Sequence, residues 1–338
     1  MRIAIASPIW ERVPPPAYGG IEAVVSLVAN GLARRGHDVT LYATGDSITS
    51  ARLRSVCPRS LRAANVAESL PYQLVHASSV ITEAGQYDVI HNHCGELLMT
   101  LAGLAPTAML TTIHGPMVPD SQIVWDHYAG YYNTISLASK DGFPDRGYLG
   151  VVYNGIDVES FPFTREKDDY LLFLGRLSLE KGTHVALQAA RALGQRLVIA
   201  GKVDRVDQGY FDSQVAPLLD DPKVSFVGEA DAIRKRELFA GARCLLHPVS
   251  WPEPFGLVMA EAMACGTPVI AFGRGSIPEV VAHGETGFVV DSLDGMIDAV
   301  HHLGEIDPER CRSWVNERFS AEGMVSGYEE LYARIASD

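Results

Sequence analysis

The chain has 338 residues, of which 47% are apolar and 20% are charged. This composition is that of a globular protein and excludes a disordered chain, and the length predicts two domains of ~150 residues each. Lys and Arg number 28 against 41 Asp and Glu, which leaves a net charge of −13 and no basic run. A nucleic-acid partner and an anionic membrane are therefore disfavoured.

The five cysteines are widely spread, and no pair has the close spacing of a zinc site. Reduced thiols in the cytoplasm are the simplest interpretation. The first apolar stretch, residues 3–6, is far too short for a signal peptide, and nowhere do ~18 apolar residues run together. We expect a cytoplasmic protein that does not span a bilayer. Peripheral membrane contact needs only one apolar or basic face, so it stays an open alternative.

Short β-rich runs alternate with helical periodicity, the pattern typical of parallel α/β sheets. A strand at 2–6 leads through a Pro/Gly-rich loop into a helix whose apolar positions recur from Ile21 to Leu32, with Gly36 as its C-terminal cap. Further strands of this set are predicted at 39–43, 88–91, 108–114 and 133–136. The stretch 46–70 receives no assignment.

A second set of strands is predicted at 170–174, 196–200, 224–227, 243–247, 268–272 and 287–290. The polar, turn-forming residues 153–169 separate the two sets and are interpreted as a linker. The sequence thus predicts an N-terminal domain over 1–152 and a C-terminal domain over 170–320. An amphipathic helix at 321–336 can pack on either domain.

Ligands of open parallel sheets bind beyond the carboxyl ends of the strands, so the strand-to-helix loops are the candidate sites. Gly19 and Gly20 stand just before a helix, where backbone amides can approach an anion, although a tight turn is the plain alternative. Gly175, Arg176 and Lys181 follow a strand directly. A guanidinium and an ammonium there would suit a diphosphate, and a solvated loop is the alternative.

The densest signal is WPEPFGLVMAEAMACG at 251–266. A helix that begins near Gly256 or Leu257 would direct the amides of Phe255, Gly256 and Leu257 at a ligand. Glu261 would then lie ~7.5 Å along the helix axis, where its carboxylate can accept two hydrogen bonds from a ribose, with Glu253 near the entrance. Solvent-facing glutamates are the alternative.

The sequence lacks the complete motifs of dinucleotide-binding, metal, hydrolase and P-loop sites. Gly273-x-Gly275 begins a dinucleotide fingerprint, but Pro278 stands where the third glycine belongs. The sequence contains no Asp-x-Asp motif, and its Cys and His spacings form no metal cage. The hydrolase elbow and the P-loop are also missing. We therefore expect no catalytic metal and no cofactor.

These motifs resemble those of glycosyltransferase family 4, a retaining family with the GT-B fold of two facing Rossmann-like domains and a cleft between them. The chain is similar to short bacterial members. The resemblance rests on GRLSLEKG at 175–182, EPFGLVMAE with its Glu-x7-Glu spacing, EAMACGTPVIA at 261–271, and GSIPEVV to GETGFVV at 275–290. Thinner matches are YGGIE at 18–22, TTIHGP at 111–116 and YNGID at 153–157.

The resemblance implies a role for each matching residue of the second domain. Arg176 and Lys181 would hold the donor diphosphate, and Glu261 would bind the ribose hydroxyls. Glu253 would contact hydroxyls of the transferred sugar, joined by the amides of residues 255–257. Contacts to the donor base are expected near Gly201, Lys202 and Gly228.

From the first domain, the resemblance implies that Gly19 and Gly20 close over the diphosphate and that His114 faces the sugar. A capped structural histidine is the alternative for His114. His91 and His93 are interpreted as mainly structural.

The implied reaction transfers a sugar from a UDP- or GDP-linked donor to an acceptor hydroxyl, with retention and without a metal. Arg176 and Lys181 would stabilise charge on the departing diphosphate, whose oxygen takes the acceptor's proton. The partners would be a nucleotide sugar and a small-molecule or glycan acceptor. A nucleotide-sugar epimerase, a non-catalytic binding module and an NAD-dependent dehydrogenase are the alternatives, and the sequence names neither the base, the sugar nor the acceptor.

Overall fold

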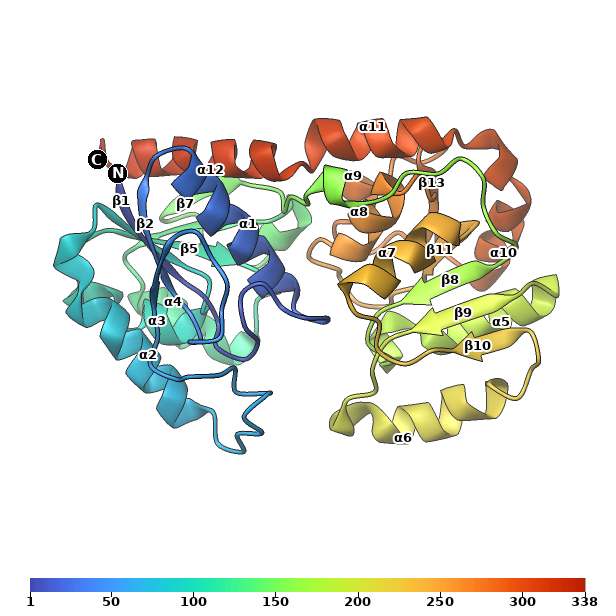
Figure 1. The fold of residues 1–338 in the computed structure, drawn as a ribbon, viewed down its shortest axis with the longest axis horizontal. Helices are drawn as coiled ribbons and strands as arrows, with labels where there is room; N and C mark the ends of the chain where they lie inside the picture. Colours follow the sequence, from blue (N-terminus) through green and yellow to red (C-terminus); the bar gives the residue numbers. More distant parts are fainter. Residues whose placement is uncertain (338) are drawn as a thin grey trace. The chain divides into compact units, whose positions relative to one another are not determined.

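A computed structural model describes residues 1–337, which divide into two compact units. Unit 1 comprises Met1–Gly155 together with the chain from Ala321 on, and unit 2 comprises Ile156–Ser320. Residues 156–169, assigned to a linker from the sequence, thus fall within unit 2, and the C-terminal helix falls within unit 1. Each unit is built around one parallel sheet with helices against it, which confirms the predicted α/β class (Figure 1).

Unit 1 holds a seven-stranded parallel sheet in the order β3-β2-β1-β4-β5-β6-β7. The strands are β1 (Arg2–Ala6), β2 (Asp38–Tyr42), β3 (Arg52–Arg54), β4 (Val89–Asn92), β5 (Met109–Ile113), β6 (Tyr131–Thr134) and β7 (Tyr148–Val151). The sequence predicts all of them except β3 and β7. β3 is a three-residue edge strand with two exposed arginines, and β7 is only half-buried, so neither carries the buried apolar run that marks a strand.

The helices of unit 1 are α1 (Gly20–Arg34), α2 (Leu70–Thr82), α3 (Glu96–Met99), α4 (Gln122–His127) and α12 (Ala321–Ile335). The α12 helix returns from the end of the chain to lie beside α1 (Figure 1). Arg35, just after α1, donates to Glu322 at 2.7 Å and also pairs with Glu329, while Gly31 faces Val325. The α12 helix therefore belongs to the packed structure of unit 1.

Unit 2 holds a six-stranded parallel sheet in the order β10-β9-β8-β11-β12-β13. Its strands are β8 (Leu171–Leu174), β9 (Leu197–Ala200), β10 (Val224–Phe226), β11 (Cys244–His247), β12 (Val269–Phe272) and β13 (Gly287–Val290), all at predicted positions. Its helices are α5 (Thr183–Leu193), α6 (Gln208–Tyr210), α7 (Ala232–Gly241), α8 (Leu257–Ala264), α9 (Ile277–Val280), α10 (Leu293–His301) and α11 (Pro308–Arg318). Within residues 1–337, no helix has the length and apolarity needed to cross a membrane.

The strand order reverses once in each sheet. From β1 the chain adds β2 and β3 on one side and then returns to place β4 on the other, and β8 stands in the same relation to β9, β10 and β11. Because parallel crossovers share one hand, connections after the two central strands leave toward opposite faces of the sheet. The loops that follow β1 and β4, and those that follow β8 and β11, are therefore where each sheet can receive a ligand.

The contact between α1 and α12 makes a stability prediction. A Cβ on Gly31 would lie 2.6 Å from Cγ2 of Val325. Ala is favoured over Gly in a helix by about 1 kcal/mol, but the stiff Val side chain cannot move aside freely and overpacking costs about 1–3 kcal/mol. We expect Gly31→Ala to lower the midpoint of urea unfolding measured by circular dichroism.

Gly209→Ala is the matched control, because a Cβ at Gly209 in α6 meets nothing within 4 Å. This variant should keep or raise the midpoint. A Gly31→Ala protein as stable as the control would contradict the close approach of the two helices.

Candidate active site

A buried carboxylate lies at the strand-order reversal of unit 2. Glu253, which is 6% exposed, accepts from Lys181 Nζ at 2.5 Å and from Trp251 Nε1 at 3.0 Å, both on Oε2. The same ammonium lies 4.8 Å from the centre of the Trp251 ring, and His247 Nε2 lies 3.7 Å from the carboxylate. Arrangements of this kind stabilise a charge that burial alone would penalise.

The electrostatics of this cluster keep Glu253 ionised. Burial acts to raise the pKa of Glu253, but the His247 ring and the Lys181 ammonium lower it by more, to about 2. Burial lowers the pKa of His247, although the adjacent carboxylate acts to raise it. At neutral pH the cluster therefore contains an anionic Glu253 and a neutral His247.

Two glycines bring three loops together at this carboxylate. Gly182 has φ +72°, and a Cβ there would lie 2.2 Å from the Pro248 carbonyl oxygen, so the loop after β8 rests on the loop after β11. Gly275 has φ +59°, and its Cβ would lie 2.4 Å from the Glu253 carbonyl oxygen, which accepts from the Ser276 amide at 2.8 Å. Larger side chains at Gly182 or Gly275 would separate these loops.

Three carboxylates surround Arg176 in the loop after β8. Its guanidinium pairs with Glu180 and lies 3.9 Å from an Asp204 oxygen and 3.8 Å from an Asp207 oxygen. Its Nε is buried without a hydrogen-bond partner, as is Oδ2 of Asp207. These carboxylates already compensate the charge of Arg176. A polyanionic ligand could pair with the guanidinium only by taking their place.

Glu261 offers a second buried carboxylate on α8. It is 8% exposed, so the alternative interpretation as a solvent-facing helix residue is wrong. Lys235 of α7 donates to Oε1 at 2.5 Å, whereas Oε2 is buried and has no hydrogen-bond partner. The α8 helix begins at Leu257 after Gly256, as predicted. The Met259 amide donates to the Gly256 carbonyl at 2.9 Å, so the amides that lack a helical acceptor are those before Met259. The unpartnered oxygen is suited to accept a ligand hydroxyl.

The residues predicted to contact a donor base also lie beside the Arg176 loop. The Gly201 amide donates to the Gly228 carbonyl at 2.8 Å, and the Leu177 amide donates to the Lys202 carbonyl at 2.9 Å. Lys202 Nζ pairs with Asp204 at 2.9 Å. A Cβ on Gly201 would clash with the Gly175 carbonyl oxygen, so these loops are in direct contact.

At the carboxyl edge of the unit 1 sheet, histidines follow β4 and β5. His93 Nδ1 and His114 Nε2 share a hydrogen bond of 2.8 Å, and burial lowers the pKa of His114 to about 4. Gly19 is the N-cap residue of α1, so Gly19 and Gly20 open the helix after β1. Glu22 in the first turn of α1 is also buried, and burial raises its pKa to about 7. Each unit thus gathers its predicted site residues at one edge of its own sheet.

Sequence reasoning missed His247, Trp251, Lys235 and Asp207. His247 ends β11 and Trp251 stands two positions before Glu253, so their places next to the EPFG motif were the available signal. Lys235 comes from α7, and only the packing of α7 against α8 brings it to Glu261. No sequence signal identifies Asp207, because its position depends on the loop after β9.

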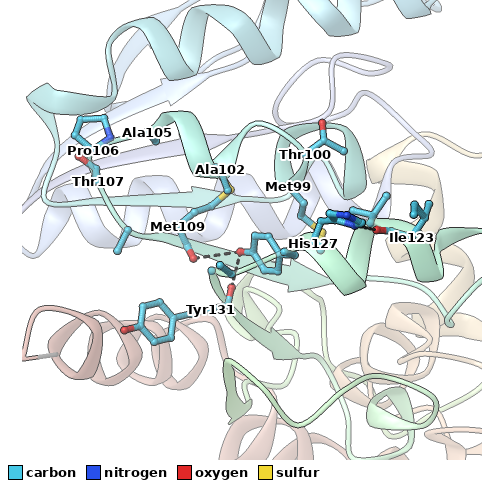
Figure 2. A pocket seen from close by; sticks show the side chains of 16 residues that line it. Met99, Thr100, Ala102, Ala105, Pro106, Thr107, Met109, Ile123, His127 and Tyr131 are labelled. Atoms are coloured by element: carbon cyan, nitrogen blue, oxygen red, sulfur yellow. Dashed lines mark hydrogen bonds between the residues drawn. The ribbon is translucent and has the colours of Figure 1, made fainter.

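The sequence also gave no sign of a mainly apolar cavity in unit 1. It has a volume of about 610 Å³ and is lined by residues that include Met99, Met109, Ile123 and Tyr131 (Figure 2). Met109 and Tyr131 begin β5 and β6, so the cavity lies at the amino edge of the sheet, and none of the predicted site residues line it. Residues 1–337 contain no cluster of three or more His, Cys, Asp or Glu placed to hold a metal.

Comparison with known proteins shows which family the chain belongs to. The family model described as Glycosyltransferase Family 4 matches residues 18–160, and the model described as Glycosyl transferases group 1 matches residues 157–317. The chain belongs to glycosyltransferase family 4. Together the two models span both units of the structure, and this membership does not favour the epimerase alternative.

Relatives of this glycosyltransferase align with nearly the whole chain. The N-acetyl-alpha-D-glucosaminyl L-malate synthase of Bacillus anthracis is 26% identical and covers 96% of each chain. The D-inositol 3-phosphate glycosyltransferase of Mycolicibacterium smegmatis is 27% identical, covering 100% of this chain and 92% of the relative. The crystal structure of AviGT4, a glycosyltransferase involved in avilamycin A biosynthesis, superimposes with a TM-score of 0.78 at 26% identity over 100% and 98% of the two chains. The fold is therefore GT-B, with two Rossmann-like domains.

The depressed pKa of Glu253 predicts an acid-dependent loss of stability. A carboxyl with an ordinary pKa of 4.5 that is held at about 2 contributes about 3 kcal/mol above pH 4.5, and this contribution is lost as the pH falls toward 2. We expect the difference in unfolding free energy between the parent protein and Glu253→Gln, measured with urea, to shrink over that interval.

Glu68→Gln serves as the control, because Glu68 is exposed. Its unfolding free energy should stay within about 0.5 kcal/mol of the parent. A difference between parent and Glu253→Gln that does not change from pH 6 to pH 3 would contradict the buried ion pair.

Proposed function

We propose that this glycosyltransferase moves a sugar from a uridine or guanosine diphosphate donor to an acceptor hydroxyl, with retention of configuration and without a metal ion. The observation that carries the proposal is the buried Lys181–Glu253 ion pair at the strand-order reversal of unit 2, with Arg176 in the same loop after β8 as Lys181, where a Rossmann-like sheet receives its ligand. The family membership supports the enzyme class.

In this proposal the donor diphosphate replaces carboxylates that already neutralise the cations. Arg176 would leave Glu180, Asp204 and Asp207 for phosphate oxygens, and Lys181 would turn from Glu253 toward the diphosphate. Such an exchange keeps each cation paired. On the buried Glu253 carboxylate a sugar hydroxyl would donate in place of the Lys181 ammonium, while the Trp251 N–H keeps its hydrogen bond.

The nucleoside would be recognised by Glu261 and the loops beside Arg176. Oε2 of Glu261 is buried without a partner, and a ribose hydroxyl would supply the missing donor. The loops around Gly201, Lys202 and Gly228 lie close enough to Arg176 to bound the base on the same side. Gly19 and Gly20 at the start of α1, and His114 after β5, are the groups of unit 1 that we assign to the diphosphate and the sugar.

The proposed chemistry breaks the bond between the anomeric carbon and the phosphate oxygen while the acceptor oxygen bonds to that carbon on the same face. The acceptor's proton passes to the departing phosphate oxygen, so no separate base is needed. Negative charge grows on the diphosphate, and Arg176, Lys181 and the first-turn amides of α8 stabilise it electrostatically. In other enzymes a divalent cation supplies this stabilisation.

We further propose a small hydroxylated acceptor. The names of the two relatives specify L-malate and D-inositol 3-phosphate, both small hydroxylated molecules, as groups that those enzymes act on or build from. The five cysteines are free thiols, four of them buried, which supports a reducing compartment such as the cytoplasm as the site of the reaction.

The ribose contact is tested by calorimetry with UDP, GDP and inorganic pyrophosphate, each with and without EDTA. Glu261→Gln should weaken the preferred nucleoside diphosphate by about 1.5–3 kcal/mol, because a charged acceptor is lost, and should leave pyrophosphate binding unchanged. The chelator should change neither. Equal affinity of parent and variant for both nucleotides would remove Glu261 from the donor site, and loss of binding with EDTA would reject the metal-free site.

A catalytic role for Lys181 is tested by turnover at saturating donor. Lys181→Ala should lower kcat by about 10²–10³-fold if its contact strengthens as the diphosphate leaves, with a smaller change in donor affinity. Lys235→Ala is the comparison, because Lys235 contacts Glu261 and should mainly affect donor affinity. An unchanged kcat in Lys181→Ala would exclude the role, and product NMR showing an inverted anomer would exclude retention.

A further inference from the structure

A buried polar network crosses the centre of the unit 1 sheet and reaches α12. His91 on β4 contacts the Tyr332 hydroxyl through Nδ1 at 2.6 Å and Thr112 Oγ1 through Nε2 at 2.7 Å. The Thr112 hydroxyl donates its proton to Asn133 Oδ1 at 2.8 Å. Thr112 must therefore accept from Nε2–H of His91, whose Nδ1 in turn accepts from Tyr332. The network holds His91 in one tautomer.

His93 lies between His91 and His114. Its ring centroid is 4.0 Å from that of His91 and 5.1 Å from that of His114. It is 2% exposed, its Nδ1 shares the 2.8 Å hydrogen bond with His114 Nε2, and its Nε2 is buried without a partner. His93 thus has a tilted ring contact with His91, at an interplanar angle of 44°, and a single hydrogen bond to His114.

The unpartnered Nε2 of His93 indicates which histidine donates in the hydrogen bond between His93 and His114. Burial lowers the pKa of all three histidines, so each ring is neutral and carries one proton. If His114 donated from Nε2, the His93 proton would lie on Nε2 as a buried N–H without an acceptor. Orphaned buried N–H groups are rarer than acceptors that lack a donor. The favoured arrangement puts the His93 proton on Nδ1 and donates it to His114.

We propose that His93 is a positioning residue for sugar transfer, because its Nδ1–H occupies Nε2 of His114 and thereby holds the His114 proton on Nδ1. The other ring nitrogen of the half-buried His114 then presents a fixed N–H donor, suited to an oxygen atom of the transferred sugar. This inference rests on the proposed function, since it assigns His114 to the sugar. The His91 ring packs against His93 and is itself hydrogen-bonded to Tyr332 of α12, so the C-terminal helix takes part in the arrangement through His91.

The first test reads the tautomer directly, by long-range ¹H–¹⁵N NMR of the full chain labelled with ¹⁵N-histidine. We expect His114 to show a protonated Nδ1 and an unprotonated Nε2 in the parent protein. In His93→Leu, which cannot donate, His114 should lose this single tautomer. A parent His114 protonated on Nε2, or an unchanged His114 spectrum in His93→Leu, would overturn the proposal.

The second test separates positioning from folding by kinetics. His93→Leu should lower kcat by about 10–100-fold, the scale seen when a group that orients a metal-bound histidine is removed, while the affinity for nucleoside diphosphate stays within about twofold. His93→Asn, whose amide can donate from near the Nδ1 position, should recover most of the loss. His76→Leu is the control, because His76 is buried in the same unit and bonds to the Ser7 carbonyl rather than to His114. It should leave the His114 spectrum unchanged.

Equal losses of kcat in His93→Asn and His93→Leu would indicate a merely structural role and overturn the proposal. The NMR result does not depend on turnover. A parent protein with the expected His114 tautomer but without any transferase activity would therefore fail the proposed function while the hydrogen-bond arrangement held, and the opposite pair of results would fail the inference alone.

Discussion

The site in unit 2 depends on one constraint, which is that the Glu253 carboxylate is buried as an anion and must be compensated where it lies. Lys181 supplies the positive charge at 2.5 Å, and Trp251 and His247 complete the surroundings. The loops after β8, β11 and β12 are in close contact around this carboxylate, with Gly182 and Gly275 at the points of contact. The same contacts that compensate the buried carboxylate place Lys181 at the edge of the sheet where we propose that the diphosphate binds.

Unit 1 also buries polar side chains near its candidate site, but these side chains are neutral. His91, His93 and Thr112 are buried near the centre of its sheet, and hydrogen bonds through Tyr332 of α12 satisfy His91. A helix from the end of the sequence therefore matters to residues more than 200 positions earlier. The surroundings of Glu253 in unit 2 keep it ionised, and burial keeps the three histidines of unit 1 neutral; a fixed protonation state is a property that a preorganised site requires.

The sequence predicted most of the fold because β8 to β13 and the central strands of unit 1 are buried apolar runs with helices between them. It could not predict β3 or β7, whose residues are largely exposed or half-buried, nor settle where α12 packs, since an amphipathic helix does not identify its partner. The Glu-x7-Glu spacing pointed to Glu253 and Glu261, but the pairing of Glu261 with Lys235 and the fixed geometry of His93 depend on contacts between distant segments. The apolar cavity near Met109 could not be predicted either, because segments distant in the sequence line it.

The most direct test of this account is a crystal structure of the protein with its preferred nucleoside diphosphate. The account predicts phosphate oxygens within hydrogen-bond distance of Arg176 and Lys181, a ribose hydroxyl on Oε2 of Glu261, and a Glu253 carboxylate released from Lys181. A nucleotide bound elsewhere, with Lys181 still paired to Glu253 and Oε2 of Glu261 still unpartnered, would contradict it.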